Sequence, residues 1–165
     1  MKKIFAICAV ALVACVMFTS CSKDETTNKN AATVTFNGTS WKAGQFYADV
    51  TPQAAHDYIT MIVAEDFANN DMPYASGFVG GTANQTYTYD PQHPEESCFF
   101  TYCETHTAPE WMCKSGSQEI TDLDLNGKTI SARCVEVVTK NNVDADLIVD
   151  MNNAEWTAQA ISKRR

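Results

Sequence analysis

The sequence predicts an all-β fold: an antiparallel β-sandwich or β-barrel of about ten strands, placed after a cleavable leader. Three observations predict it. An uncharged apolar run from Ile4 to Phe18 opens the chain, short apolar runs separated by Asn-Gly and Asn-Asn pairs fill much of the remainder, and helical periodicity is nearly absent.

The leader comes first along the chain. Lys2 and Lys3 precede the apolar run, which is the charge pattern of a secretory signal peptide. The run of about fifteen residues is shorter than the roughly 20 apolar residues that a helix needs to cross a bilayer. We therefore expect residues 1–20 to be a signal peptide that is removed.

Cys21 is the predicted point of lipid attachment. Thr19-Ser20-Cys21 resembles a lipobox, with Phe18 where leucine is usual. The resemblance implies a lipoprotein signal peptide, with Cys21 as the first residue of the mature chain and the carrier of acyl chains such as palmitate. Two or more such chains hold a protein stably on a membrane.

The segment after this cysteine indicates a destination. Lys23, Asp24 and Glu25 resemble the Lys-acidic-acidic export signal of Bacteroidota-type surface lipoproteins. The resemblance implies an outer-membrane protein that is exposed on the cell surface and contacts the membrane through the lipid at Cys21.

The rest of the chain divides into a tether and one domain. Residues 21–32 are polar and lack apolar periodicity, so they are predicted to form a lipidated flexible tether. Removal of the leader leaves 145 of the 165 residues. Residues 33–165 are enough chain for a single all-β domain with its own core.

The charge balance excludes one class of partner. Acidic residues outnumber basic residues by twenty to twelve, and loss of Lys2 and Lys3 makes the ratio twenty to ten. Nucleic-acid binding requires clustered Lys and Arg, so we expect no nucleic-acid partner.

Pairs that contain asparagine are the predicted turns. Asn-Gly between strand-like runs favours a tight hairpin because both turn positions adopt positive φ. The pairs are Asn37-Gly38, Asn126-Gly127, Asn141-Asn142 and Asn152-Asn153. The last three pairs divide the C-terminal forty or so residues into a predicted meander of antiparallel strands, with a strand break at residues 152–153.

Side-chain alternation indicates which faces are buried. From Val143 to Met151, alternate residues are apolar and most of the others are aspartates, so this strand should face water on one side. Residues 58–64 are apolar on both faces and should be covered on both. These patterns fit a sandwich or a closed barrel, including a lipocalin-like barrel.

The cysteine-rich middle of the chain is its most unusual stretch. Cysteines of an exported protein favour disulfide bonds, so we predict up to two of them, in any of three connectivities. The candidates are Cys98, Cys103, Cys113 and Cys134. If residues 98–103 form one strand, Cys98 and Cys103 lie on opposite faces and should not pair with each other.

No catalytic residue, metal site or cofactor motif is predicted. Cys103 and His106 are three residues apart. A structural zinc site, however, needs four ligands at a recognised spacing, and a cysteine-histidine catalyst needs a third group to orient the histidine. The chain also lacks a Gly-rich phosphate loop and a nucleophile elbow. We therefore expect a protein that is not an enzyme and binds no cofactor.

Aromatic residues provide the candidate ligand surface. Several between Tyr87 and Trp111 fall outside the clear alternation and could stack on a sugar or an apolar ligand, although most aromatic residues belong in a core. Within this stretch we select Tyr102, His106 and Trp111.

Two parts of the domain resemble small Bacteroidota lipoprotein families of unknown function: residues 34–41 (VTFNGTSW), and residues 116–124 (GSQEITDLD) followed by residues 128–132 (KTISA). The resemblance implies an all-β fold and no assigned catalytic residue. The expected function is a non-catalytic binding or accessory module for a glycan, a small apolar ligand or an envelope protein. The alternatives are a structural subunit of an envelope complex and an enzyme of unfamiliar type.

Overall fold

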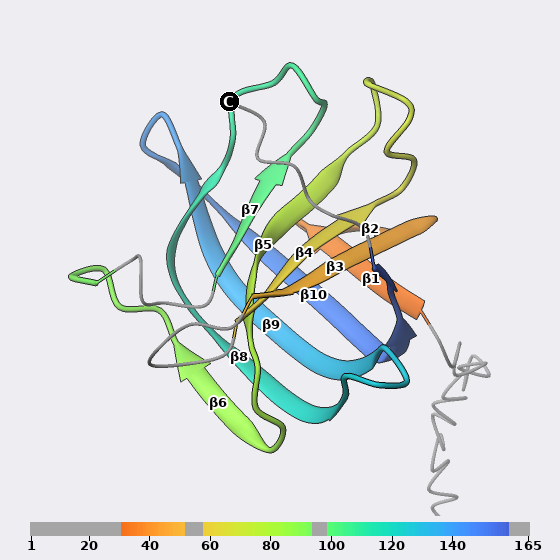
Figure 1. Cartoon of the computed structure of the whole chain (residues 1–165). Coiled ribbons are helices and arrows are strands. Elements are labelled where there is room, and N and C mark those ends of the chain that lie inside the picture. The colour runs from red at the N-terminus through yellow and green to blue at the C-terminus, as the bar shows by residue number, and fades with distance from the viewer. Residues whose placement is uncertain (1–30, 52–57, 94–98, 159–165) are drawn as a thin grey trace, which may run out of the picture.

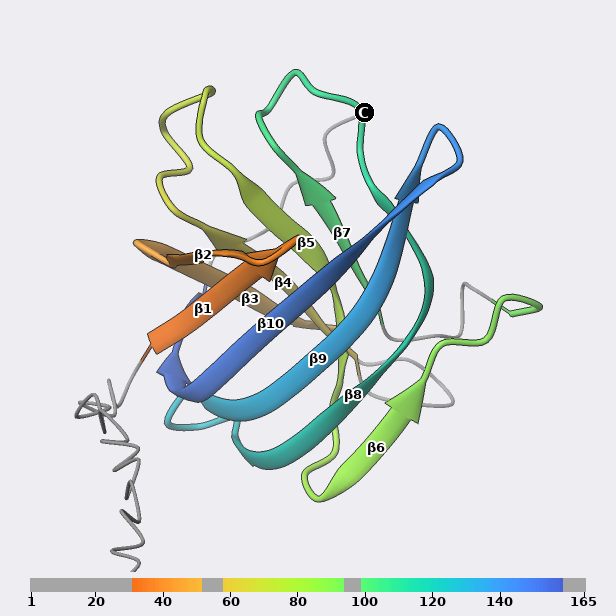
Figure 2. The same ribbon diagram turned by 180° about the vertical axis from the view of Figure 1, so that it is seen from behind.

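Two β-sheets packed face to face make up the domain (Figure 1). The computed structural model describes residues 31–51, 58–93 and 99–158. Sheet A has the strand order β2-β1-β10-β9-β8-β6, and sheet B has the order β11-β3-β4-β5-β7. Figure 2 shows sheet A in front. The all-β prediction is confirmed, and the arrangement is the sandwich.

The strands differ greatly in length. Sheet A contains β1 (Ala31–Phe36), β2 (Thr39–Lys42), β6 (Gln85–Thr88), β8 (Met112–Asp124), β9 (Thr129–Lys140) and β10 (Val143–Glu155). Sheet B contains β3 (Gln45–Thr51), β4 (Tyr58–Ala64), β5 (Tyr74–Gly80), β7 (Phe100–Cys103) and β11 (Thr157–Ala158). Neighbouring strands are antiparallel, except that β11 runs parallel to β3.

Two predicted hairpin turns are confirmed by their backbone angles. Asn37 and Gly38 have φ of 47° and 82° between β1 and β2, and Asn141 and Asn142 have φ of 53° and 63° between β9 and β10. Both positions of each turn therefore adopt the left-handed conformation that a two-residue hairpin requires, which asparagine and glycine tolerate best.

The other two predicted turns differ from expectation. The β8–β9 turn forms, but Lys128 rather than Asn126 is the non-glycine residue with positive φ, and the Asp124 carboxylate accepts the N–H groups of Asn126 and Gly127. At residues 152–153 the predicted strand break is wrong. Strand β10 continues through a β-bulge between Met151 and Ala154, because an asparagine with positive φ serves a bulge as well as a turn.

The core lies between the sheets. The alternation predicted for residues 143–151 is confirmed for Ala145, Leu147, Val149 and Met151, which are all buried, but it is wrong for Val143, which is 59% exposed beside the β9–β10 turn. No residue of β4 is exposed, which agrees with its apolar character on both faces. The facing residues of sheet B include Ile59, Met61 and Val63, each with no exposed surface.

The chain also connects the two sheets at their edges. After Glu155 it leaves sheet A and joins sheet B as β11, with the buried Trp156 at the corner. At the other side, Tyr102 of β7 and Trp111, next to β8, exchange backbone hydrogen bonds of 3.1 and 2.8 Å. Within the described residues, no helix has the length and apolar character needed to span a membrane.

The two tryptophans that follow asparagine-containing turns should contribute unequally to stability. Trp156 is 4% exposed, whereas Trp41 packs only partly buried against the core. We expect Trp156→Ala to lower the free energy of unfolding by about 3–5 kcal/mol, and Trp41→Ala by about half as much, because less area and a smaller cavity are involved. Urea denaturation of both variants measures this; equal losses would contradict the role of the Trp156 corner.

Candidate functional site

The predicted ligand residues Tyr102 and Trp111 lie in the core. They are 5% and 8% exposed, respectively. The Tyr102 ring stacks on Phe36 at a centroid distance of 4.1 Å, and Trp111 meets the same ring edge-on at 5.1 Å. Burial raises the pKa of the Tyr102 hydroxyl. Their rings therefore form part of the packing between the sheets and present no open stacking face.

The third predicted ligand residue, His106, belongs to a separate aromatic cap on the outer face of sheet B. Its ring lies 4.9 Å from that of Phe67 and 5.0 Å from that of Tyr74, and Tyr47 completes the group. The His106 backbone N–H donates to the carbonyl of Asn70, which joins the β7–β8 loop to the β4–β5 loop. This cap holds two loops over the sheet.

The predicted disulfides involving Cys103 and Cys113 do not form. Both are free, buried thiols. Cys103 alternates with the core residues Phe100 and Tyr102 and so faces outward from sheet B, whereas Cys113 contacts Glu136 inside the sandwich. The two thiols therefore lie in different layers. Cys134 is fully buried.

Several predicted residues lie outside the described part of the chain. They are the lipid-attachment residue Cys21, the export residues Lys23, Asp24 and Glu25, and Cys98. Strand β1 begins at Ala31, two residues before the predicted domain boundary.

A buried polar cluster spans the sandwich behind β7. Glu136 of β9 is 3% exposed, and its two carboxyl oxygens lie 3.1 and 2.9 Å from the backbone nitrogen of Phe100, which donates to them. Gln118 of β8 has no exposed surface, and its Nε2 donates to the Phe78 carbonyl at 3.0 Å and to Glu136 at 3.3 Å. Side chains of sheet A thus provide the hydrogen-bond partners of two backbone groups of sheet B that lie in a water-poor interior.

A glycine makes room for this cluster. Gly116 faces Glu136 across the β8–β9 ladder, has φ of 151°, and follows a bulge between Cys113 and Ser115. A Cβ on Gly116 would lie 2.5 Å from the Val135 carbonyl oxygen and 2.7 Å from the Glu136 Cα. The backbones can approach so closely only because residue 116 has no side chain.

The electrostatics of the cluster favour uncharged groups. Burial raises the pKa of Glu136 to about 7, although hydrogen bonds from Phe100, Gln118 and Cys113 oppose the shift. Burial and the nearby Glu136 carboxyl raise the pKa of the Cys113 thiol far above its ordinary value. A thiol that resists ionisation is a poor nucleophile, so the pair is unsuited to cysteine catalysis.

Three residues of different chemical character lie in a row across the outer face of sheet B. Asp49 of β3 faces Thr60 of β4, and Thr60 faces Phe78 of β5. Residues paired in this way have Cβ atoms about 5 Å apart, so a carboxylate, a hydroxyl and an aromatic side chain are neighbours on this face. Phe78 is 38% exposed, more than any other aromatic residue in the described part of the chain. We call Asp49, Thr60 and Phe78 the platform.

Further aromatic rings support the platform at one end. The Phe78 ring meets Tyr58 at 6.4 Å and Phe99 at 6.1 Å, both edge-on, and Phe99 meets Tyr89 at 5.7 Å. Such edge-to-face contacts favour fixed ring orientations, and Phe78 remains 38% exposed within this group.

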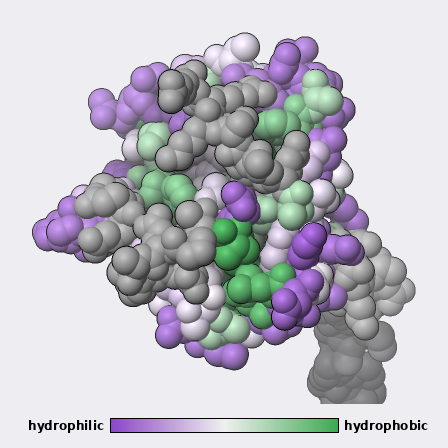
Figure 3. Space-filling model, in the orientation of Figure 1, coloured by the Kyte–Doolittle hydropathy of each residue, from purple (hydrophilic) through white to green (hydrophobic). Residues whose placement is uncertain are grey.

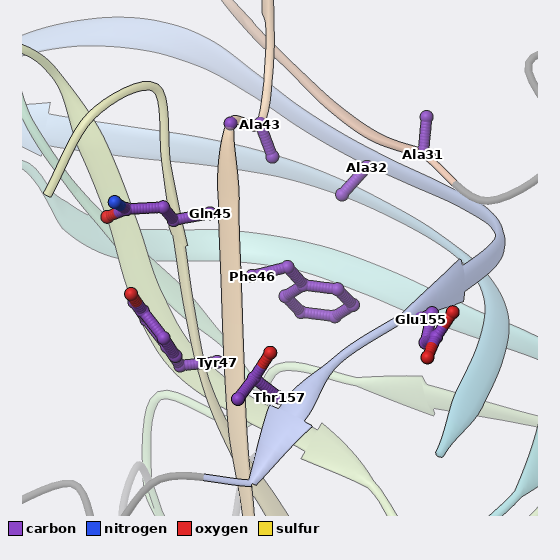
Figure 4. Close-up of a pocket in the computed structure, with 9 residues that line it drawn as sticks. Ala31, Ala32, Ala43, Gln45, Phe46, Tyr47, Glu155 and Thr157 are labelled. Atoms are coloured by element: carbon purple, nitrogen blue, oxygen red, sulfur yellow. The ribbon is translucent and has the colours of Figure 1, made fainter. Parts of the chain in front are cut away.

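A pocket of about 250 Å³ opens where the two sheets part near the start of β1 (Figure 4). Phe46 projects from β3 into this space near Thr157 and Ala32, whereas Gln45 and Tyr47 project from the other side of the strand. Among the described residues that line it, Glu155 is the only charged one. The other lining residues are uncharged, and three of them are alanines. Because titratable groups do not converge in the pocket, it is a weaker candidate for a ligand site than the platform.

Comparisons with known proteins add no family: no protein-family model, curated protein or solved structure matches the chain. In the described residues, no group of three or more His, Cys, Asp or Glu side chains is placed to hold a metal ion. Sequence reasoning missed Phe78 and Glu136. Strand alternation could have indicated that Phe78 faces opposite to Val79, but it could not show which side of β5 is covered.

The close approach at Gly116 can be tested by adding a methyl group. We expect Gly116→Ala to lower the free energy of unfolding by about 2–4 kcal/mol, because the new Cβ meets backbone atoms that cannot move independently. Gly38→Ala is the matched control, since Gly38 also has positive φ but no atom lies within 4 Å of a Cβ there. Gly38→Ala should lower the free energy of unfolding by about 1 kcal/mol. Chemical denaturation compares the two; similar losses would show that φ alone matters.

Proposed function

We propose that the protein is a lipid-anchored surface lipoprotein of the outer membrane, similar to those of Bacteroidota, and that its domain is a non-catalytic module that binds neutral carbohydrate on the platform. One observation carries the binding proposal: Phe78 is exposed in register with a hydroxyl and a carboxylate.

The chemistry of the platform matches that of a sugar ring. A pyranose has a C–H face that stacks on an aromatic ring and hydroxyl groups around its rim that donate to a carboxylate and exchange hydrogen bonds with a hydroxyl. Phe78 supplies the first surface, and Asp49 and Thr60 supply the second. Figure 3, in the orientation of Figure 1, shows hydrophobic residues at the surface among hydrophilic ones on this side of the molecule.

The negative charge of the platform and of the whole chain favours neutral carbohydrates over anionic ones. Asp49 lies on the platform itself, and acidic residues outnumber basic ones by twenty to twelve in the whole chain. This balance repels anionic polysaccharides and tolerates neutral ones. The proposed ligands are therefore uncharged oligosaccharides.

The proposed anchor is close to the domain in sequence. Strand β1 begins about ten residues after Cys21, and about ten extended residues reach at most about 35 Å. A lipid at Cys21 would hold the platform within this distance, plus the size of the domain, of the membrane surface. This position suits a protein that collects polymer fragments at a cell surface.

Binding can be measured with the full chain in detergent micelles against neutral hexasaccharides of glucose, xylose, mannose and N-acetylglucosamine. We expect at least one to raise the thermal unfolding midpoint, and Phe78→Ala to weaken its binding at least tenfold, about 1.4 kcal/mol. Asp49→Asn should also weaken binding, because the carboxylate loses its charge-assisted hydrogen bonds.

Matched controls come from the opposite sheet. Val135 is 44% exposed and Asp146 is exposed, both on sheet A. Val135→Ala and Asp146→Asn remove an exposed apolar group and an exposed charge without touching the platform, and should leave sugar binding unchanged. If no neutral sugar binds, or if the platform and control variants lose binding equally, the carbohydrate proposal is wrong.

The anchor has its own test. Cys21→Ser should abolish incorporation of labelled palmitate, remove the protein from the outer-membrane fraction, and make processing of the precursor insensitive to globomycin, the inhibitor of lipoprotein signal peptidase. Cys15→Ser, within the apolar run, is the control and should change none of these. An unlabelled wild-type protein in the soluble fraction would overturn the lipoprotein assignment.

A further inference from the structure

The buried cluster around Glu136 contains one acceptor without a donor, although Phe100, Gln118 and Cys113 all donate to the carboxyl. The single N–H of Phe100 serves both oxygens of Glu136, and the two hydrogens on Gln118 Nε2 serve the Phe78 carbonyl and Glu136. Gln118 Oε1 is buried without a hydrogen-bond partner among the described residues. An unpaired acceptor in a water-poor interior is costly.

The surroundings of Glu136 provide no compensating cation. Strand β8 presents the Cys113 thiol and the neutral Gln118, and β7 presents the Phe100 N–H. Leu147 is the β10 residue opposite Glu136 in the ladder, and Tyr89 lies beyond the Cys113 thiol. In the part of the chain that the structure describes, no Lys or Arg pairs with this carboxyl, so its charged form would be buried without a partner.

We propose that Glu136 is a proton-operated latch between the two sheets. In its neutral form the carboxyl holds the Phe100 N–H and the Gln118 amide across the dry interior and keeps β7 closed on β8 and β9. In its ionised form the uncompensated charge draws water into this edge of the sandwich, and β7 loosens. The latch stands on the contacts of Glu136 and does not require the carbohydrate function.

The direction of the pH effect follows from the pKa of Glu136, which burial raises to about 7. The native state therefore retains a proton that the unfolded chain releases near the ordinary pKa of about 4.3. The contribution to stability is complete below that ordinary pKa and is lost as the pH rises through about 7. The latch is thus closed in mildly acidic surroundings and loosened in mildly alkaline ones.

Nuclear magnetic resonance of the isotope-labelled full chain tests this from pH 5 to 9. We expect the Glu136 carboxyl carbon and the Phe100 amide to titrate with one shared midpoint near 7. Above this midpoint the exchange of the Phe100 amide hydrogen, corrected for its intrinsic pH dependence, should accelerate at least tenfold. The urea midpoint of unfolding should fall over the same pH range.

The control variants separate this carboxyl from general pH effects. Glu136→Gln keeps the shape without the titration, so its Phe100 amide should show no inflection near pH 7, whereas Glu119→Gln, at an exposed position of β8, should behave as the wild type. If Glu136→Gln does not fold, the wild-type titration still decides. The latch would be overturned by a titration midpoint of the Glu136 carboxyl below pH 5, or by a Phe100 amide whose chemical shift and hydrogen exchange do not change as Glu136 titrates.

Discussion

Two backbone groups of sheet B that point into the sandwich impose the constraint on which the rest of the structure depends. The Phe100 N–H and the Phe78 carbonyl must find partners away from water, and leaving either unpaired would cost about 1–3 kcal/mol. Glu136 and Gln118 provide those partners from sheet A. Because these residues reach across the core, the register of β8 and β9, the bulge before Gly116 and the position of β7 must all agree.

The same constraint connects the interior to the proposed binding surface. The carbonyl of Phe78 is held by Gln118, while its ring faces outward beside Thr60. By contrast, the rings of Tyr102 and Trp111 pack against Phe36 in the core. The domain thus divides its aromatic residues between a core that stabilises the sandwich and an outer face on which Phe78 is exposed.

Local patterns predicted much of the fold. The turns at residues 37–38 and 141–142 and the buried face of β10 follow from short-range preferences, and the structure has them as expected. The predicted break at residues 152–153 was wrong because an asparagine with positive φ also fits a β-bulge, and only pairing with β9 distinguishes the two. The predicted disulfides of Cys103 and Cys113 failed because strand alternation does not show which sheet a strand joins.

The sequence alone determined the fold class, most of the turns and the face of β10 that is buried, because these depend on residues close together in the chain. It also carries the whole case for the lipid anchor at Cys21. Only the tertiary structure decided that Tyr102 and Trp111 are packed inside, that Phe78 is exposed, and that Glu136 meets Phe100 from 36 residues away. Exposure and a raised pKa are produced by neighbours distant in sequence, and no local pattern specifies which neighbours those are.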